Sequence, residues 1–118
     1  MDGVDMLQDM LDRQAALQAR LPRFADSVSQ TQRLIDNAEM AACEAVEWKN
    51  GLPWKKHRQD YGRVLTSQEL EHVLEEIVDV LHFVLNGFLV AGVTTSEEVY
   101  ARFLTKHQVN HKRQNDGY

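Results

Sequence analysis

Two pairs of carboxylates, each with members three residues apart, are the side chains of this sequence best suited to chemistry. The first pair is Glu44 and Glu47, and the second is Glu76 and Asp79. Residues three apart on a helix project from the same face, so each pair can direct two acidic side chains at one point. Carboxylates packed together repel each other unless a cation binds or their pKa values rise. The spacing therefore predicts a site for a hard cation.

The residues around both pairs are apolar, which indicates that the pairs face protein rather than bulk water. These neighbours are Ala41, Ala42, Ala45 and Val46 for the first pair, and Ile77, Val78, Val80 and Leu81 for the second. Mg²⁺ prefers oxygen ligands and is often shared between carboxylates and substrate phosphates, where it activates a water for attack on phosphorus. The pattern favours a hydrolytic site for a phosphate ester or anhydride. The alternative is a solvated acidic face, because such pairs are common on helix surfaces.

Helical spacing of apolar residues predicts the two elements that position the first pair. A first helix is expected from about residue 4 to 21, where Pro22 follows as a stop signal. A second is expected to be capped by Ser27 or Ser29 and to run to about residue 49, carrying Glu44 and Glu47. The motif Asn-Gly-Leu-Pro then ends it.

The second pair is expected on a third helix. Residues 51–66 mix Gly, Pro, Trp and basic residues without periodicity, so they predict a loop beside the acidic pairs. Thr66 or Ser67 then opens a helix with a broad apolar face that lasts until Gly92. A fourth helix begins near residues 94–98 and frays into a polar tail. No strand is predicted, so the fold class is an all-α, four-helix bundle-like domain.

Composition narrows the class of protein further. The chain has 118 residues, a net charge of −5, 43% apolar residues and 26% charged residues, which predicts one globular domain and disfavours binding to nucleic acid. Basic clusters around residues 49–58 and 106–113 could meet a small polyanion. No apolar run approaches the ~18 residues of a membrane span. A single cysteine, Cys43, suits a reducing compartment, so we expect a cytoplasmic protein with no membrane partner.

Three segments of the chain carry further motifs. An ExxE segment with a trailing Pro-Trp-Lys spans residues 44–55, and an ExxD segment followed by Val-Leu-His-Phe spans residues 76–83. The third segment, residues 106–118, has the sequence KHQVNHKRQNDGY. Together the three segments resemble the dimeric all-α dUTPases, within the MazG-like all-α nucleoside triphosphate pyrophosphatases, and the third is similar to the closing motif of that family. The resemblance covers most of residues 44–118. It implies one domain over residues 1–118, with residues 105–118 as a flexible tail that closes over phosphate.

The resemblance also implies roles for individual residues at the phosphate end of a nucleotide. Glu44, Glu47, Glu76 and Asp79 would be Mg²⁺ ligands, and Glu47 would also orient the attacking water as a base. Three residues of the closing segment, Lys106, Asn110 and Arg113, would contact the triphosphate with support from Lys55. Arg and Lys suit this task because they donate charge-assisted hydrogen bonds to phosphate.

At the nucleoside end, the resemblance implies that a glutamine of the first helix reads the pyrimidine. Gln14 is the best match, and Gln8 is an alternative. An amide offers both a donor and an acceptor to a base. Trp54, His82, Phe83 and Asn86 are expected to border the base or sugar, although His82 and Phe83 suit a plain core role equally well.

The activity implied is Mg²⁺-dependent hydrolysis of dUTP to dUMP and pyrophosphate, with dUDP as a further substrate. The chain differs from the family pattern at Gln18, His57 and His107, and a MazG-like pyrophosphatase for dCTP or a modified nucleotide is an alternative. A non-catalytic helical dimerisation module is the alternative from another class. Four short helices with this much apolar surface are expected to form a homodimer or homotetramer.

Overall fold

Four helices make up the regular structure of the residues that the structure describes, as the sequence predicts. The structure, a computed structural model, describes residues 5–21 and 28–117. The helices are α1 (Met6–Ala19), α2 (Gln30–Asn50), α3 (Ser67–Val90) and α4 (Ser96–Asn115). No strand occurs within the described ranges, so the prediction of an all-α, bundle-like fold is confirmed.

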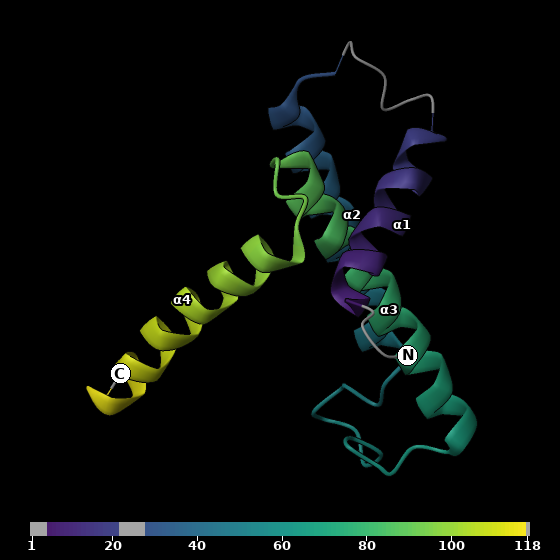
Figure 1. Cartoon of the computed structure of the whole chain (residues 1–118). Helices are drawn as coiled ribbons and strands as arrows, with labels where there is room; N and C mark the ends of the chain where they lie inside the picture. Colours follow the sequence, from purple (N-terminus) through teal and green to yellow (C-terminus); the bar gives the residue numbers. More distant parts are fainter. Residues whose placement is uncertain (1–4, 22–27, 118) are drawn as a thin grey trace.

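Helices α1, α2 and α3 form the body, and α4 extends away from it (Figure 1). Helices α2 and α3 lie side by side over most of their length, while α1 packs on α3. Contacts at both ends of the α2–α3 pair show that these helices run antiparallel. At one end Asn86 donates a hydrogen bond to Asn37, and at the other the backbone of Gly51 lies beside the ring of His72.

Side-chain caps fix where the helices begin. Asp5 caps α1, and Ser29 caps α2 by a capping box with Gln32, which leaves the alternative cap, Ser27, outside the described residues. Thr66 caps α3 in the same way, with Glu69 as its reciprocal partner. Each cap accepts a hydrogen bond from a backbone N–H that has no partner inside the helix.

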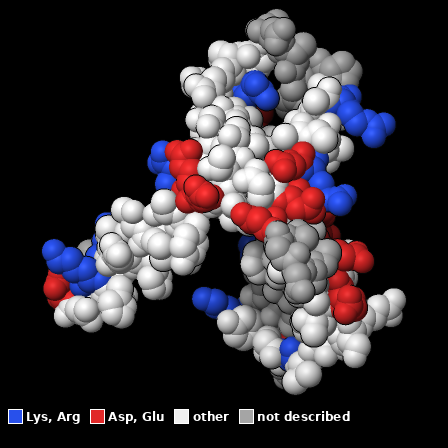
Figure 2. Space-filling model, in the orientation of Figure 1, with Lys and Arg blue, Asp and Glu red and all other residues white. Residues whose placement is uncertain are grey.

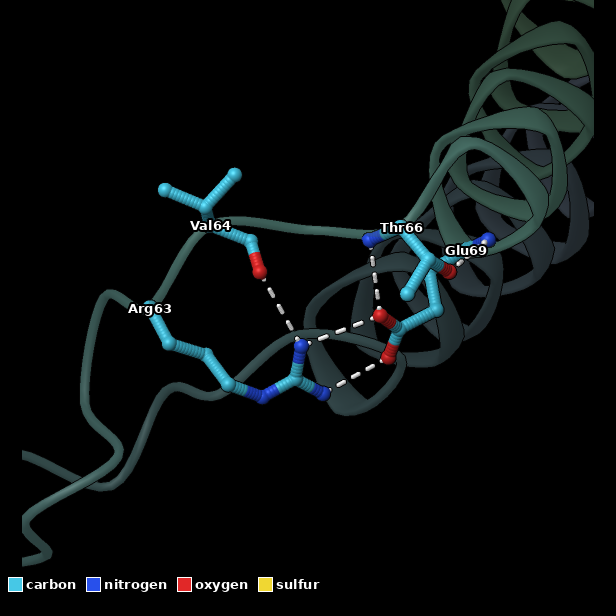
Figure 3. A network of polar contacts seen from close by, with 4 residues as sticks. All are labelled: Arg63, Val64, Thr66 and Glu69. Atoms are coloured by element: carbon cyan, nitrogen blue, oxygen red, sulfur yellow. Dashed lines mark hydrogen bonds and ion pairs between the residues drawn. The ribbon is translucent and has the colours of Figure 1, made fainter.

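The loop of residues 51–66 is irregular, as predicted, and a set of polar contacts ties its end to α3. The guanidinium of Arg63 donates two hydrogen bonds to the Glu69 carboxylate, at 3.0 and 2.6 Å, and one to the Val64 carbonyl (Figure 3). The same carboxylate accepts from the Thr66 backbone N–H. Earlier in the loop, the N–H of Gly62 donates to the Pro53 carbonyl. Gly62 has a φ of 70°, which a residue without a side chain adopts at little cost.

Helix α4 is longer than expected. Fraying was expected after about residue 104, but the helix continues to Asn115. The reason lies in its residues, because no Gly or Pro interrupts residues 96–115 and Lys112 and Arg113 complement the carboxyl end of the helix dipole. The phosphate-closing role of residues 105–118 stays a prediction.

Polar contacts anchor the start of α4 to the start of α1. Ser96 donates through its hydroxyl to Asp5, and its backbone N–H donates to Gln8 Oε1 at 2.8 Å. Gln8 in turn donates to the Thr94 carbonyl at 3.0 Å. The bond from Ser96 is the main reason that the pKa of Asp5 lies below its ordinary value.

The buried core is small for a chain of this length. The buried apolar side chains among the described residues are Leu11, Val73, Leu85 and Val93. Many other large apolar side chains stay exposed on α2, α3 and α4. Within the described ranges, no helix is long and apolar enough to cross a membrane.

Candidate functional site

Three carboxylates from α2 and α3 converge in space. Glu44 and Glu47 of α2 and Glu76 of α3 each offer one oxygen, and these oxygens all lie within 4.8 Å of one another. Glu76 and Glu44 are partly buried, whereas Glu47 is exposed. The structure therefore brings together three of the four predicted metal ligands, and it places Glu76 rather than its exposed neighbour Glu75 in the cluster.

The fourth predicted ligand, Asp79, lies beside this group. Burial raises the pKa of Glu44 above its ordinary value, and the nearby charges of Glu47, Asp79 and Glu76 raise it further. A carboxylate with a raised pKa in a group of like charges is a position that a cation would stabilise.

The donor set fits a hard cation. Glu44 Oε2 and Glu76 Oε2 are buried and have no hydrogen-bond partner within the parts of the chain that the structure describes. Ionised carboxylate oxygens can only accept, so a donor or a cation is needed to satisfy them. His72 Nε2 lies 3.4 Å from the other Glu76 oxygen, Oε1, which leaves Oε2 available.

A pocket of about 600 Å³ adjoins the acidic cluster. Its walls come mainly from α1, α2 and α3. Apolar atoms make up most of their surface, although most of the lining residues carry a polar group. This composition is typical of a small-molecule site. Glu44 and Asp79 belong to the lining, so the cluster and the pocket are continuous. The other polar lining residues are Gln14, Gln18, Arg33, Asp36, Asn37, His82 and Asn86.

The antiparallel register of α2 and α3 sets the length of this site. Asn37 of α2 contacts Asn86 of α3. Seven residues further along α2 is Glu44, and seven residues back along α3 is Asp79. Two helical turns correspond to a rise of about 10 Å. The Asn37–Asn86 pair at one end and the carboxylates at the other are therefore far enough apart for a sugar and a base to fit between them.

Gln14 of α1 lines the pocket, as does Gln18 one turn further along the helix. Gln14 is buried, and its Oε1 lies 2.8 Å from His82 Nδ1. If His82 donates this bond, the Gln14 amide keeps its N–H groups for a ligand. The alternative, Gln8, instead bonds Asp12 and the start of α4. Of these two glutamines, Gln14 lines the pocket and Gln8 does not, and a role in reading the base stays a prediction.

His82, Phe83 and Asn86 also line the pocket, as expected. Trp54 and Lys55 lie on the loop after α2, where they contact each other instead. The ring of Trp54 is covered by two ammonium groups, with Lys49 Nζ 4.2 Å and Lys55 Nζ 5.8 Å from its centroid. These cation–π contacts keep the two lysines near the end of α2 that carries Glu47.

Lys106, Asn110 and Arg113 are not gathered with the acidic cluster in this chain. All three are exposed on α4, the helix that leaves the body (Figure 1). Figure 2 shows acidic side chains around the middle of the body and basic side chains near the far end of α4. A role for these residues at the phosphate stays a prediction, and it requires a second chain or a movement of α4.

Helix α2 contributes a wall of the pocket whose residues were not predicted from the sequence. Arg33, Asn37 and Met40 line it, and Arg33 Nε is buried without a described partner. Their spacing could have indicated this wall, because these residues precede Glu44 at intervals of three to four and so share its helix face.

Comparison with known proteins adds two curated relatives. The chain is 28% identical to the "dCTP pyrophosphatase" of Enterobacteria phage LZ5, over 100% of this chain and 86% of that protein. It is also 28% identical to the "dCTP pyrophosphatase" of Enterobacteria phage T4, over 99% of this chain and 85% of that protein. No protein-family model matches the chain. No solved structure matches it significantly.

Proposed function

We propose that this protein is a Mg²⁺-dependent pyrophosphohydrolase of pyrimidine deoxynucleoside triphosphates, which cleaves between the α and β phosphates. The observation that carries the proposal is the acidic cluster at one end of a pocket about 600 Å³ in volume. The expected enzyme class, a nucleoside triphosphate diphosphatase, agrees with the names of both relatives.

The residues divide the work along the pocket. Glu44, Glu47 and Glu76 hold the cation that binds the phosphates, with Asp79 beside them as the fourth ligand. Glu47, which is exposed, also accepts the proton of the attacking water. Mg²⁺, when bound, supplies positive charge to phosphate oxygens. Trp54 packs beside the nucleotide, and Lys55, whose ammonium lies near the Trp54 ring, contacts phosphate.

Between the two pyrimidine substrates considered, dCTP is preferred over dUTP. Both relatives carry the name dCTP pyrophosphatase. The similarity of residues 44–55, 76–83 and 106–118 to dimeric dUTPases supports dUTP as the second candidate. A pocket that reads the pyrimidine edge through Gln14 suits either base, so relative rates decide between them.

The active form is a homodimer or homotetramer. On α3 the exposed apolar residues Leu70, Leu74, Val78 and Leu81 are spaced three to four apart and form one stripe. On α4 Tyr100 and Phe103 are 60% and 63% exposed. Contiguous apolar surface of this kind marks an interface between chains. In such an assembly α4 supplies Lys106, Asn110 and Arg113 to the phosphates of a second subunit.

Pyrophosphate release from dCTP, dUTP, dTTP and dATP with Mg²⁺ tests the function. We expect release from a pyrimidine nucleotide and its loss in Glu47→Gln, with nucleotide binding retained. Glu75→Gln is the matched control, because Glu75 is exposed on α3 next to Glu76 and outside the cluster. Release from no nucleotide, together with no change in Tm on adding Mg²⁺ and nucleotide, would favour the non-catalytic helical module.

Sedimentation equilibrium tests the assembly. We expect a dimer or tetramer for the native chain and dissociation in Val78→Asp, because a charge in the middle of the α3 stripe opposes its burial. Glu75→Gln again serves as control. A native chain that is monomeric at high concentration would contradict this part of the proposal.

A further inference from the structure

A chain of two side-chain amides crosses from α2 to α3 at the end of the pocket away from the carboxylates. Asn37 Nδ2 donates to the backbone carbonyl of Phe83 at 2.7 Å, and Asn86 Nδ2 donates to Asn37 Oδ1 at 3.0 Å. Both asparagines line the pocket, and Asn86 is 6% exposed.

The backbone carbonyl fixes the orientation of both amides. A carbonyl oxygen can only accept, so Asn37 must turn its NH₂ group toward Phe83. Its oxygen then faces Asn86, which must present its own NH₂ group in turn. Rotating either amide by 180° would place two oxygens in contact. We call these two linked hydrogen bonds the relay. Its last atom is Asn86 Oδ1, which takes part in neither bond.

Asn86 Oδ1 is an acceptor that lacks a donor. It is buried and has no hydrogen-bond partner within the described residues. A buried polar group without a partner is costly, and native proteins usually satisfy it with protein, water or ligand. A ligand in the pocket that donates a hydrogen bond to Asn86 Oδ1 would therefore satisfy this acceptor.

A glycine on α3 is what lets the relay form. A Cβ added to Gly87 would lie 3.1 Å from Asn37 Nδ2, closer than most real Cβ contacts. Without that atom, the Asn37 amide can reach the backbone of α3. The close approach of α2 and α3 at this point thus allows the hydrogen bonds of the relay.

We propose that Asn86 Oδ1, oriented by Asn37, selects bases that carry an exocyclic amino group, so that cytosine is preferred over uracil. This inference rests on the proposed function and deepens it. Cytosine places an N–H donor at its 4-position, where uracil has an oxygen that would face Asn86 Oδ1 without a hydrogen bond. Gln14 can donate to the ring acceptors of cytosine at the same time. A site built to bond a polar group discriminates strongly against an analogue that lacks it.

Binding of nucleoside monophosphates separates this inference from the hydrolytic function, because no turnover is needed. We would measure Kd by isothermal titration for dCMP, dUMP and the dCMP analogue with hydrogen in place of its amino group. The native chain should bind dCMP about tenfold or more tightly than either of the others, since an unpaired buried acceptor costs about 1–3 kcal/mol. Equal binding of dCMP and dUMP, or of dCMP and its analogue, would overturn the proposal.

Two variants assign the preference to the relay. Asn86→Leu removes the acceptor at similar volume, and Asn37→Leu removes its orienter; each should bring the two Kd values within about threefold of each other. Gln68→Leu, at an exposed position on α3, should keep the native ratio. A structural defect would weaken the binding of both nucleotides and leave the ratio of their Kd values unchanged. A variant that keeps the native ratio therefore contradicts the assigned role. The analogue test on the native chain decides the outcome even where a variant does not fold. Failure of hydrolysis with a retained dCMP preference would reject the enzyme reaction alone.

Discussion

Gln14 of α1 and His82 of α3 are joined across the pocket by a contact of 2.8 Å between Oε1 and Nδ1. The two residues are far apart in the sequence and lie on different helices. Because the bond holds the Gln14 carbonyl, it determines which group of the amide is left for a nucleotide. The contact between the two helices and the proposed reading of the base therefore depend on the same pair.

Replacing this amide by a carboxylate should weaken nucleotide binding. Gln14→Glu keeps the shape and the contact with His82 but removes the N–H donors. We expect KM for dCTP to rise about tenfold or more, because burial without a hydrogen bond costs about 1–3 kcal/mol. Steady-state pyrophosphate release measures the change. Gln68→Glu, an exposed change of the same kind on α3, should leave KM unaltered; a normal KM in Gln14→Glu would show that Gln14 does not contact the base.

Neutralising Glu44 should stabilise the metal-free protein while removing its response to metal. Burial and the neighbouring carboxylates raise the pKa of Glu44, so the folded state binds a proton there more tightly than the unfolded chain does. Its ionised form therefore lowers stability as pH rises from the unfolded value of about 4.5 through the raised folded value. At pH 7, without metal, Glu44→Gln should raise Tm by several degrees.

Thermal unfolding with and without Mg²⁺ and dCTP measures both effects of this variant. The native chain should gain stability from the ligands, whereas Glu44→Gln should gain little. Glu39→Gln, at an exposed position on the same helix, is the control and should keep the native response. A Glu44→Gln protein that is less stable than native without ligands would contradict the assigned repulsion.

The Arg63–Glu69 ion pair should make the start of α3 sensitive to acid. Hydrogen bonds from Arg63, followed by that from the Thr66 backbone, lower the pKa of Glu69 to about 2. A depressed folded pKa contributes stability that is present above the unfolded value, about 4.5, and is lost as pH falls through about 2. The difference in unfolding free energy between native and Glu69→Gln chains should therefore shrink from pH 5 to pH 2. Urea unfolding at several pH values measures it, and a constant difference would exclude the charge effect.

Adding one methyl group at Gly87 should separate stability from base selectivity. Gly87→Ala raises the helix propensity of α3 by about 1 kcal/mol, but its Cβ crowds Asn37 Nδ2. We expect the dCMP preference over dUMP to fall while Tm changes little. Titration calorimetry and thermal unfolding measure the two quantities, with Ser67→Ala, at an exposed position on α3, as control. An unchanged preference would mean that Asn37 is not held by this close approach.

The sequence predicts the elements well because local signals determine them. The capping residues Ser29 and Thr66 and the apolar spacing of α3 define helices that hardly depend on the rest of the chain. The meeting of Glu44, Glu47 and Glu76 is also predictable, because their spacing fixes the face of each helix. By contrast, the Asn37–Asn86 relay depends on how closely two helices pack, which no local pattern encodes.

Contacts between residues that are distant in the sequence explain the remaining differences between the predicted and the observed structure. The direction of α4 follows from the bonds that tie Ser96 to Asp5 and Gln8, which are distant in sequence. The end of α4 is helical rather than the predicted polar tail, and Phe103, His107 and His111 stack along one side of it. A single chain also carries no signal of where a second copy would place its α4.

The most direct test of the central claim is hydrolysis of dCTP in ¹⁸O-labelled water with Mg²⁺, followed by mass spectrometry of the products. The account predicts that dCMP and pyrophosphate form, that one of these two products carries the label because water is the nucleophile, and that Glu47→Gln forms neither product. Release of orthophosphate, absence of label from both products, or full activity in Glu47→Gln would contradict it.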